Sequence, residues 1–367
     1  MALAISEAGH IYIGSDSKTI RVWKLPGFEE FGRLKSSYGG VSAILVSSED
    51  RLVFTSHSDN KVRIWRSNPI HSRKGTLPSL KDCLIETCIN RPMAIVMRAT
   101  TISSKSITSN AAYRHKHVGA ITCLAYNSLS KLLYSSSWDK TVMVWSICDM
   151  KCVETIMAHD DRVNAVVVGP DELLFTGSDD STVKIWRRSL GGGCSHGLVL
   201  KLQLQFSAVK SLVMSGEVEE SYILYVGCSD GQVHYWMKGE LSGHMNYCGC
   251  LRGHSEAVLC LAVIDQIVIS GSADTSIRVW RRSSDRLAFH CCVAILTGHT
   301  APVKGVVVRM EDYRCVVYSG DLDGSAKQWL VWKEGCVGGD GAGRSGFVVN
   351  DGGSSWADYC EISRFSG

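Results

Sequence analysis

The chain has 367 residues, of which 45% are hydrophobic, and its 39 basic and 36 acidic residues leave a net charge of +3. This small net charge gives no strong field for nucleic acid or an anionic membrane, so we expect no direct contact with nucleic acid. The chain contains no apolar run long enough to cross a bilayer, and its first ten residues lack the basic start and apolar centre of a signal peptide. The 15 cysteines are odd in number and scattered, which fits a reducing compartment. We therefore expect a cytoplasmic or nuclear protein without a membrane span.

A short β-type stretch that ends in tryptophan recurs seven times along the chain. The intervals between these tryptophans are 42, 80, 41, 50, 44 and 49 residues, so one interval is about double the others. A period of roughly 40 to 45 residues is typical of a β-propeller with four-stranded blades. Six repeats carry an aspartate six residues before the tryptophan, and the first has Ser17 there. The tryptophans are Trp23, Trp65, Trp145, Trp186, Trp236, Trp280 and Trp329.

Three segments interrupt or flank the repeats. Only "MALAIS" precedes the second strand of repeat 1, which therefore begins abruptly. Residues 68–116 fill the double interval and hold no strand that ends in tryptophan, so we interpret them as a long excursion between blades 2 and 3. Residues 334–367 are rich in glycine and serine, and we expect a flexible tail there. The sequence thus predicts one propeller over residues 1–333.

The repeats resemble those of the WD-repeat family, although no repeat tryptophan is followed by the aspartate that gives the family its name. The stretches "GTLPSLKD", "SWDKTVMVW" and "AHDDRVNAVV" are similar to plant WD-repeat proteins of the JINGUBANG type, over about residues 8–332. The resemblance implies an all-β fold, a seven-bladed propeller. Family members complete the last blade with a strand from upstream of the first, which this sequence does not supply. We expect the last blade to remain incomplete or to recruit "SGFVVN" (345–350) from the tail.

Four repeats share a histidine, a serine or threonine, an aspartate and the tryptophan at fixed positions. A Ser-His-Asp set suggests a hydrolase triad, but an enzyme needs one such site rather than four copies. The family resemblance implies structural tetrads instead, in which the hydrogen-bonded side chains hold each blade together. We therefore expect no enzyme activity and no cofactor. The tetrads are His117, Ser135, Asp139 and Trp145; His159, Thr176, Asp180 and Trp186; His254, Ser270, Asp274 and Trp280; and His299, Ser319, Asp323 and Trp329.

The other three repeats depart from this pattern. Repeat 5 has Val226 at the hydroxyl position and Phe206 and Ser207 where the histidine would stand, and repeats 1 and 2 also lack the histidine. We expect apolar packing to hold these blades.

Two further sets of residues suggest a ligand on first inspection. His244, Cys248, Cys250 and His254 could form a zinc set, but Cys248 and Cys250 alternate along a strand-like segment and His254 belongs to a tetrad, so we expect no metal. The tail sequence "GAGRSG" has the spacing of a dinucleotide-binding loop, but no strand precedes it and no helix follows.

Partner contacts are expected on the rims of the propeller. Basic residues directly after the tryptophans (Lys24, Arg66, Arg187, Arg188, Arg281 and Arg282) gather on one rim, where they would meet an acidic partner or lipid headgroups, or only solvent. On the opposite rim, the resemblance places partner contacts after the tetrad histidines and before the aspartates. Trp138 there would be an aromatic anchor, or would pack on the next blade. The partner-binding residues expected are Thr122, Trp138, Asp160, Asp161, Asn164, Asp179, Lys210, Glu256, Lys304 and Leu322.

These features favour a non-catalytic, regulatory scaffold or adaptor that binds other proteins. A substrate receptor of a cullin-based ubiquitin ligase is one alternative, but its acidic residue and arginine after a blade tryptophan are replaced here by Arg187 and Ser189, and by Arg281 and Ser283. The separated targeting propeller of a larger enzyme is another, although no kinase motif occurs.

Overall fold

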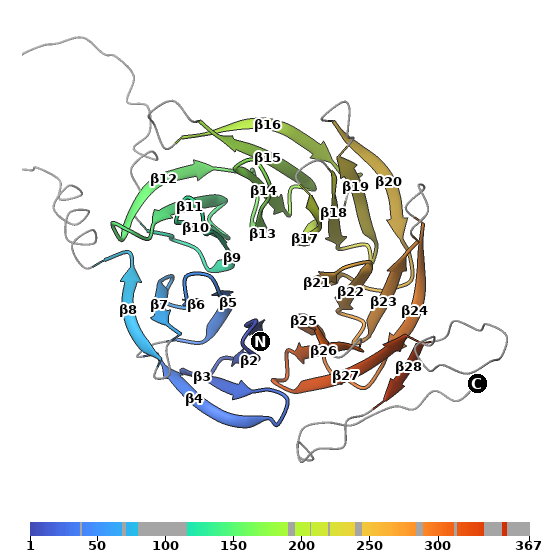
Figure 1. Ribbon diagram of the computed structural model, residues 1–367. Helices are drawn as coiled ribbons and strands as arrows, with labels where there is room; N and C mark the ends of the chain where they lie inside the picture. Colours follow the sequence, from blue (N-terminus) through green and yellow to red (C-terminus); the bar gives the residue numbers. More distant parts are fainter. Residues whose placement is uncertain are drawn as a thin grey trace, which may run out of the picture.

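The computed structural model is a ring of seven antiparallel sheets, each with four strands (Figure 1). It describes residues 1–36, 39–67, 71–79, 116–189, 195–205, 207–218, 221–238, 244–283, 289–311, 314–333 and 347–350. The strands of each sheet follow one another in chain order from the ring axis outward. The prediction of a seven-bladed, all-β propeller is therefore confirmed. We number the sheets as blades 1 to 7 in chain order.

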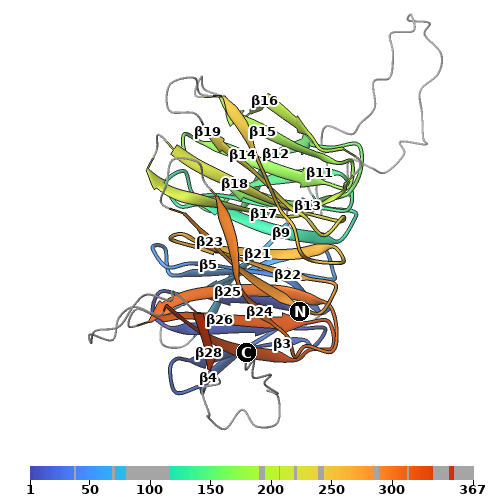
Figure 2. The same cartoon turned by 90° about the vertical axis from the view of Figure 1, so that its right-hand side faces the viewer.

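The strands are short and leave the turns at the two rims of the ring, which Figure 2 shows from the side. Blades 1 to 4 comprise β1 (Ala2–Ile5), β2 (His10–Gly14), β3 (Thr19–Lys24) and β4 (Glu29–Lys35); β5 (Val41–Ser47), β6 (Leu52–His57), β7 (Val62–Arg66) and β8 (Ser72–Leu77); β9 (Ile121–Asn127), β10 (Leu132–Ser137), β11 (Thr141–Ser146) and β12 (Lys151–Met157); and β13 (Val163–Val168), β14 (Leu173–Ser178), β15 (Thr182–Arg188) and β16 (His196–Gln203). Blades 5 to 7 comprise β17 (Val209–Val218), β18 (Ser221–Cys228), β19 (Val233–Lys238) and β20 (Met245–Leu251); β21 (Val258–Ile264), β22 (Ile267–Ser272), β23 (Ile277–Arg282) and β24 (His290–Leu296); and β25 (Val303–Glu311), β26 (Arg314–Asp321), β27 (Ala326–Lys333) and β28 (Phe347–Asn350). None of the described residues forms a helix with the length and apolar character needed to cross a membrane.

The apolar core lies between the blades. Every residue of β14 is buried, since its sheet is covered on both faces, and such strands have near-continuous rather than alternating apolar patterns. Seven apolar clusters form, one between each pair of neighbouring blades. Phe175 and Leu224 meet in the cluster between blades 4 and 5. The cluster between blades 7 and 1 is the smallest described, with Ile11, Leu25, Val316 and Tyr318 as its buried members.

The turn between the second and third strands of a blade has a left-handed residue after its aspartate. Lys140, Ser181 and Thr275 have φ angles of 73°, 63° and 67°. Gly231 and Gly324 stand at this position in blades 5 and 7, and glycine adopts such angles without strain. The turn holds the aspartate side chain against the backbone of the turn. From there the carboxylate can also contact the link that precedes the first strand of the same blade.

The prediction that the excursion begins at residue 68 is wrong, because blade 2 continues beyond that residue. Residues 72–77 form β8, the outer strand of blade 2, which pairs with β7. The strand carries little apolar signal because most of its residues face solvent on the outside of the ring. The rest of the predicted excursion, apart from residues 71, 78–79 and 116, lies outside the described residues.

The two ends of the propeller meet at blade 1 and blade 7. The sequence "MALAIS" supplies β1, the innermost strand of blade 1, and β1 lies beside β5 and β25. Blade 7 has three strands up to Lys333, and the four-residue β28 pairs with β27 from Leu330 to Lys333. The outer strand of blade 7 therefore comes from the tail, as one of the two sequence hypotheses required. Residues 334–346 and 351–367 of the tail lie outside the described residues.

Candidate functional site: the tetrad rim

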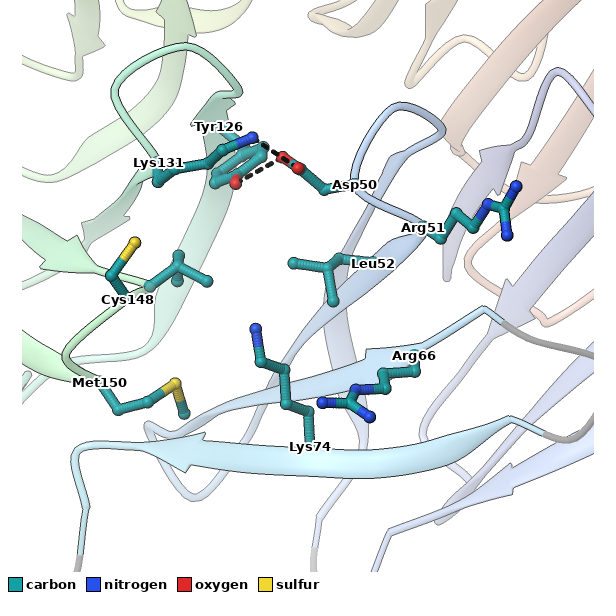
Figure 3. A pocket seen from close by; sticks show the side chains of 10 residues that line it. Asp50, Arg51, Leu52, Arg66, Lys74, Tyr126, Lys131, Cys148 and Met150 are labelled. Atoms are coloured by element: carbon teal, nitrogen blue, oxygen red, sulfur yellow. Dashed lines mark hydrogen bonds and ion pairs between the residues drawn. The ribbon is translucent and has the colours of Figure 1, made fainter.

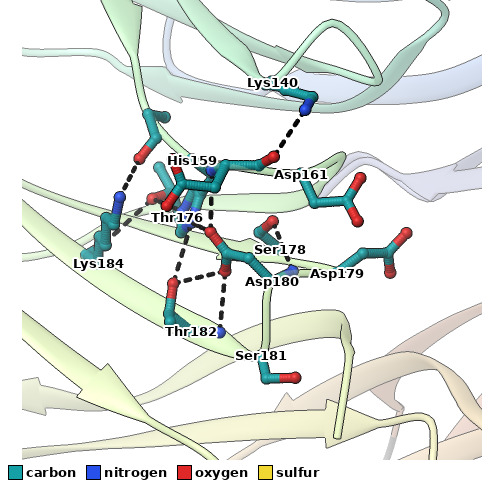
Figure 4. Close-up of polar contacts among 12 residues, drawn as sticks. Lys140, His159, Asp161, Thr176, Ser178, Asp179, Asp180, Ser181, Thr182 and Lys184 are labelled. Carbon is teal, nitrogen blue, oxygen red and sulfur yellow. Dashed lines mark hydrogen bonds and ion pairs between the residues drawn. The ribbon is translucent and has the colours of Figure 1, made fainter. Parts of the chain in front are cut away.

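In blade 4 a tetrad joins the link before the first strand to the middle of the blade, and Figure 4 shows three of its members, His159, Thr176 and Asp180. His159 Nδ1 lies 2.8 Å from Asp180 Oδ2, and Nε2 lies 2.8 Å from Thr176 Oγ1. The indole NH of Trp186 donates to the same Thr176 oxygen at 3.0 Å. Because an ionised carboxylate only accepts, Nδ1 carries the proton and Nε2 accepts from the threonine hydroxyl. Burial lowers the pKa of His159 against the opposing effect of Asp180, which keeps the imidazole neutral.

The same network forms in blades 3 and 6. The imidazole–carboxylate distances are 3.0 and 2.8 Å, and both indole–hydroxyl distances are 2.9 Å. Burial alone would raise the pKa of Asp139, but hydrogen bonds from His117, Thr141 and the backbone outweigh it and hold that pKa well below its usual range. The members are His117, Ser135, Asp139 and Trp145 in blade 3, and His254, Ser270, Asp274 and Trp280 in blade 6.

In blade 7 the prediction of Asp323 as the aspartate of the tetrad is wrong. His299 Nδ1 binds Asp321 Oδ2 at 2.9 Å, whereas Asp323 is exposed. Asp321 occupies the strand-end position that serine holds in blades 3, 4 and 6, and its side chain is completely buried. Because the carboxylate of Asp321 already contacts the imidazole of His299, Asp323 is not part of the network. The other predicted members, Ser319 and Trp329, bind as expected, with the indole NH 2.8 Å from the hydroxyl.

A fifth side chain in each network was missed by the sequence analysis. Thr182 Oγ1 donates to Asp180 Oδ1 at 2.6 Å and lies 3.1 Å from His159 Nδ1. A hydroxyl two residues after the aspartate was the available signal in blades 3, 4 and 6. The equivalent residues are Thr141, Ser276 and, in blade 7, Ser325.

Blade 2 does have a histidine in its network, contrary to the prediction. His57 stands at the end of β6, with Nε2 2.9 Å from Thr55 Oγ1, and Trp65 donates to the same oxygen at 2.9 Å. The expected place for the histidine was before the first strand of the blade, whereas His57 ends the second strand. With no imidazole to bind, Asp59 forms an ion pair with Arg63 at 2.6 Å instead.

Blade 5 follows the prediction of apolar packing at the hydroxyl position, where Val226 is completely buried. Ser207 takes the histidine position and lies 3.4 Å from Ser229. Phe206 lies outside the described residues. In blade 1, Tyr12, Ile20 and Val22 are fully buried in the cluster shared with blade 2.

We call the rim that carries these networks the tetrad rim; it consists of the links before each first strand and the turns between second and third strands. Trp138 lies on it in a blade 3 turn and is 50% exposed. The guanidinium of Arg162, from the link into blade 4, lies 4.6 Å from the centre of its ring. The ring therefore contacts the next blade, as one alternative expected, and presents half of its surface to solvent; its role as a partner anchor stays a prediction.

Part of the predicted partner set is tied up between blades. Asn164 Nδ2 donates to Asp179 Oδ1 at 2.7 Å, and Lys210 Nζ binds the same oxygen at 2.6 Å. These contacts connect blades 4 and 5. Thr122 is used similarly, since its hydroxyl donates to the backbone of Val163 at 2.6 Å.

The remaining predicted residues are accessible. Leu322 is 56% exposed, and the others in this group are also exposed: Asp160, Asp161, Glu256 and Lys304. Two exposed apolar residues of the same rim were missed, Val118 at 62% and Met157 at 60%. Both flank a tetrad histidine in the sequence, which was the available signal.

His254 belongs to the set with His244, Cys248 and Cys250 that resembles a zinc site in the sequence, where we expected no metal. Both ring nitrogens of His254 are within hydrogen-bonding distance of tetrad atoms, at 2.8 Å from Asp274 and 2.8 Å from Ser270. The imidazole is therefore committed to the fold of blade 6.

A ring of four-stranded blades, five of which have a histidine–hydroxyl–tryptophan network, defines the class of repeat propellers. The chain belongs to the WD-repeat family: the family model described as "WD domain, G-beta repeat" matches residues 29–66, 111–146, 150–187, 245–281 and 290–329, just over half of the chain.

Similar proteins carry the repeats in different settings. An uncharacterized WD repeat-containing protein of Schizosaccharomyces pombe is 27% identical over 173 residues, which are 45% of this chain and 45% of that protein. Autophagy-related protein 16 of Arabidopsis thaliana is 22% identical over 74% of this chain and 52% of its own length. Cell division control protein 4 of Saccharomyces cerevisiae is 25% identical over 63% of this chain and 31% of its own length. The chain thus spans about half or less of these relatives.

Proposed function

We propose that the protein is a non-catalytic regulatory scaffold that binds other proteins on the tetrad rim, at a site centred on Trp138. The half-exposed ring of Trp138, held by Arg162, is the observation that carries this proposal. Aromatic and arginine side chains dominate the binding energy of many protein interfaces. A ring already fixed against its neighbour loses little conformational entropy on binding.

Other exposed residues of the tetrad rim also support a protein partner. Val118 and Leu322 add exposed apolar surface to the tetrad rim, and Asp160, Asp161 and Lys304 add charges of both signs. Such a mixture of apolar anchors and a polar periphery is typical of interfaces between proteins. The tetrads beneath keep the turns that carry these side chains in place.

The test is affinity purification with mass spectrometry on the wild type and on a Trp138→Ala, Lys304→Glu double variant. We expect the double variant to lose partners while its melting temperature stays nearly unchanged. The matched control is Arg187→Gln with Arg281→Gln on the opposite rim, which should retain the same partners. Partners kept by the double variant and lost by the control would place the site on the opposite rim and overturn the proposal.

We further propose that the protein is cytoplasmic or nuclear. We also propose that it is related to the plant WD-repeat proteins of the JINGUBANG type, because it shares the motifs quoted above. The names of these relatives concern autophagy and cell division, which supports a module that serves different assemblies. The same purification separates the two alternatives: cullin-ligase subunits would indicate a substrate receptor, and a kinase or another enzyme would indicate a separated targeting propeller.

A further inference from the structure

A pocket of about 500 Å³ opens between blades 2 and 3, on the rim opposite the tetrads (Figure 3). The turns that join the first two strands of each blade form one side, with Asp50 from blade 2 and Lys131 from blade 3. Lys74 in β8 and Arg66 at the end of β7 form the other side. Four basic residues and one acidic residue line the pocket in all.

The one acidic group in the pocket is already used. Asp50 Oδ1 pairs with Lys131 Nζ at 2.5 Å, and Oδ2 accepts from the Tyr126 hydroxyl at 2.7 Å. The hydrogen bond from Lys131 is the main cause of a lowered pKa of Asp50, so this carboxylate is ionised at neutral pH. Both carboxylate oxygens are therefore occupied, and Asp50 acts on Lys74 only through a charge–charge attraction weaker than that on Lys131. The basic residues of the pocket still outnumber its one acid.

Lys74 and Arg66 are the cations that remain. Both are exposed, and neither forms an ion pair with an acidic side chain of the described residues. In Figure 3 the Lys74 ammonium extends into the pocket, and the Arg66 guanidinium lies beside it, whereas Arg51 points away. Two adjacent cations repel each other unless an anion lies near both.

The same region of blade 4 shows what is different here. Arg188, the second residue after the tryptophan of that blade, pairs with Glu172 at 3.4 Å, and Lys238 of blade 5 pairs with Asp171 at 3.7 Å. Arg187, which lies opposite Leu173 as Arg66 lies opposite Leu52, is exposed like Arg66. In blade 4 two acids of the first turn thus neutralise two basic residues. In blade 2 the single acid that lines the pocket pairs across to blade 3, and Arg66 and Lys74 are left over.

Apolar side chains complete the pocket. Leu52 and Ile147 are buried in its wall, and Met150 is partly buried beside them. A ligand must therefore offer an anionic group and an apolar group close together. An extended polyanion such as nucleic acid or a lipid surface would need a continuous basic field, and the net charge of the chain is only +3.

We propose that this pocket binds an acidic peptide segment of a partner protein, with a carboxylate or phosphate against Lys74 and Arg66 and an adjacent apolar side chain against Ile147 and Met150. This second site is independent of the tetrad rim, so the protein would hold two partners at once. A charge-assisted contact to two cations sets the affinity and its dependence on salt.

The test uses the methyl group of Met150 as a reporter in NMR spectra of the whole chain labelled with ¹³C at methionine methyl groups. The probes are the synthetic peptide acetyl-Glu-Leu-Glu-Glu-amide, its version with phosphoserine for the central glutamate, and a version with glutamine at all three glutamates. We expect the Met150 signal to shift with the first two peptides and not with the third. The stronger of the two charged peptides identifies carboxylate or phosphate as the natural group.

Matched variants locate the site. Arg66→Gln with Lys74→Gln should weaken binding of the charged peptides by about tenfold or more, since each charge-assisted contact contributes on the order of 1 to 3 kcal/mol. Arg187→Gln removes an exposed basic residue at the corresponding place in blade 4, outside this pocket, and this variant should bind the charged peptides normally. Equal binding of the glutamine peptide, or unchanged binding in the double variant, would overturn the proposal.

Two further measurements separate the alternatives. Vesicles of phosphatidylcholine with phosphatidylserine should not sediment the protein, and their binding in place of the peptides would show a membrane site instead. The Trp138→Ala, Lys304→Glu variant should bind the charged peptides like the wild type. The two proposals are thus tested separately: one experiment can reject the tetrad rim as a partner site, and another can reject this pocket.

Discussion

The turn of blade 7 contains two aspartates, two residues apart, that differ completely in environment. Asp321 accepts hydrogen bonds from His299 and from the hydroxyl of Ser325, at 2.9 and 2.6 Å, and is buried. Asp323 stands at the tetrad spacing from the tryptophan and is exposed. Burial and partners, rather than spacing, therefore decide which aspartate supports the fold.

We predict that Asp321→Ala lowers the free energy of unfolding by about 1 to 3 kcal/mol, because the variant leaves the buried imidazole without its acceptor. Asp274→Ala should have a similar effect in blade 6. Asp323→Ala is the matched control, and its change should stay within about 0.5 kcal/mol. Denaturation by urea measures all three, and a larger effect for Asp323 than for Asp321 would contradict the assignment of the network.

The buried histidines predict a loss of stability in mild acid. Burial is the main cause that lowers the pKa of His57 from 6.5 to about 4, and it also lowers those of His159, His254 and His299. The unfolded chain takes up these protons first as the pH falls below about 6.5, so stability is complete above that pH and declines toward pH 4. Aspartates whose pKa is lowered in the folded state, such as Asp139, add a loss of their own below about pH 5, so the decline between about pH 6.5 and 5 belongs to the histidines.

We expect the melting temperature to be nearly constant from about pH 8 to 7 and to fall between about pH 6.5 and 4. His57 by itself accounts for up to about 3 kcal/mol of this loss. His57→Gln should be less stable at pH 7 and show a shallower decline, because one titrating group is gone. A melting temperature that rises toward pH 5 would refute the expectation.

At the scale of elements, the outer strand of blade 7 differs from the six others. It has four residues, and its pairing with β27 covers only Leu330 to Lys333. The neighbouring outer strand, β24, has seven residues and follows its blade directly in the chain. An edge whose backbone groups lack a partner can pair with another chain.

Removal of residues 334–367 should therefore lower the melting temperature and increase aggregation on heating. The control is removal of residues 351–367, which retains β28. We expect this shorter deletion to behave like the full chain. Light scattering during a thermal ramp measures both properties, and equal behaviour of the two truncated proteins would show that β28 does not protect the edge.

For the whole molecule, the ring closes through its smallest described apolar cluster. Ile11 from blade 1 packs there with Val316 and Tyr318 of blade 7, while Leu224 lies in the larger cluster between blades 4 and 5. A propeller that opens locally should open where the least apolar surface holds two blades together.

We predict that Ile11→Ala costs about 2 to 5 kcal/mol and accelerates hydrogen exchange first in blades 1 and 7. Leu224→Ala should cost a similar amount but accelerate exchange around blades 4 and 5. Hydrogen exchange followed by mass spectrometry distinguishes the two patterns. Exchange that increases uniformly around the ring in both variants would mean that the propeller unfolds only as one unit.

The sequence by itself determined the architecture and three of the four predicted tetrads. The tryptophan spacing identified seven blades because each repeat must bury one face against its neighbours. The tetrads of blades 3, 4 and 6 followed from fixed positions, since these three blades have the histidine, the hydroxyl and the aspartate at matching places in their strands and turns. The sequence also allowed the tail strand β28 to be predicted, because it is an apolar, β-branched segment that follows a blade with an unpaired edge.

Other features were decided only by the tertiary structure. Asp321 displaces Asp323, and His57 replaces the missing histidine of blade 2, because a buried network selects whichever side chain reaches it in space. The outer strand β8 was not predicted, because its residues have little strand propensity and its pairing with β7 makes it a strand. The basic pocket between blades 2 and 3 joins residues of two blades, so no single repeat could reveal it. Spacing along the chain reports contacts within a repeat, whereas charge balance and burial between repeats depend on how the ring closes.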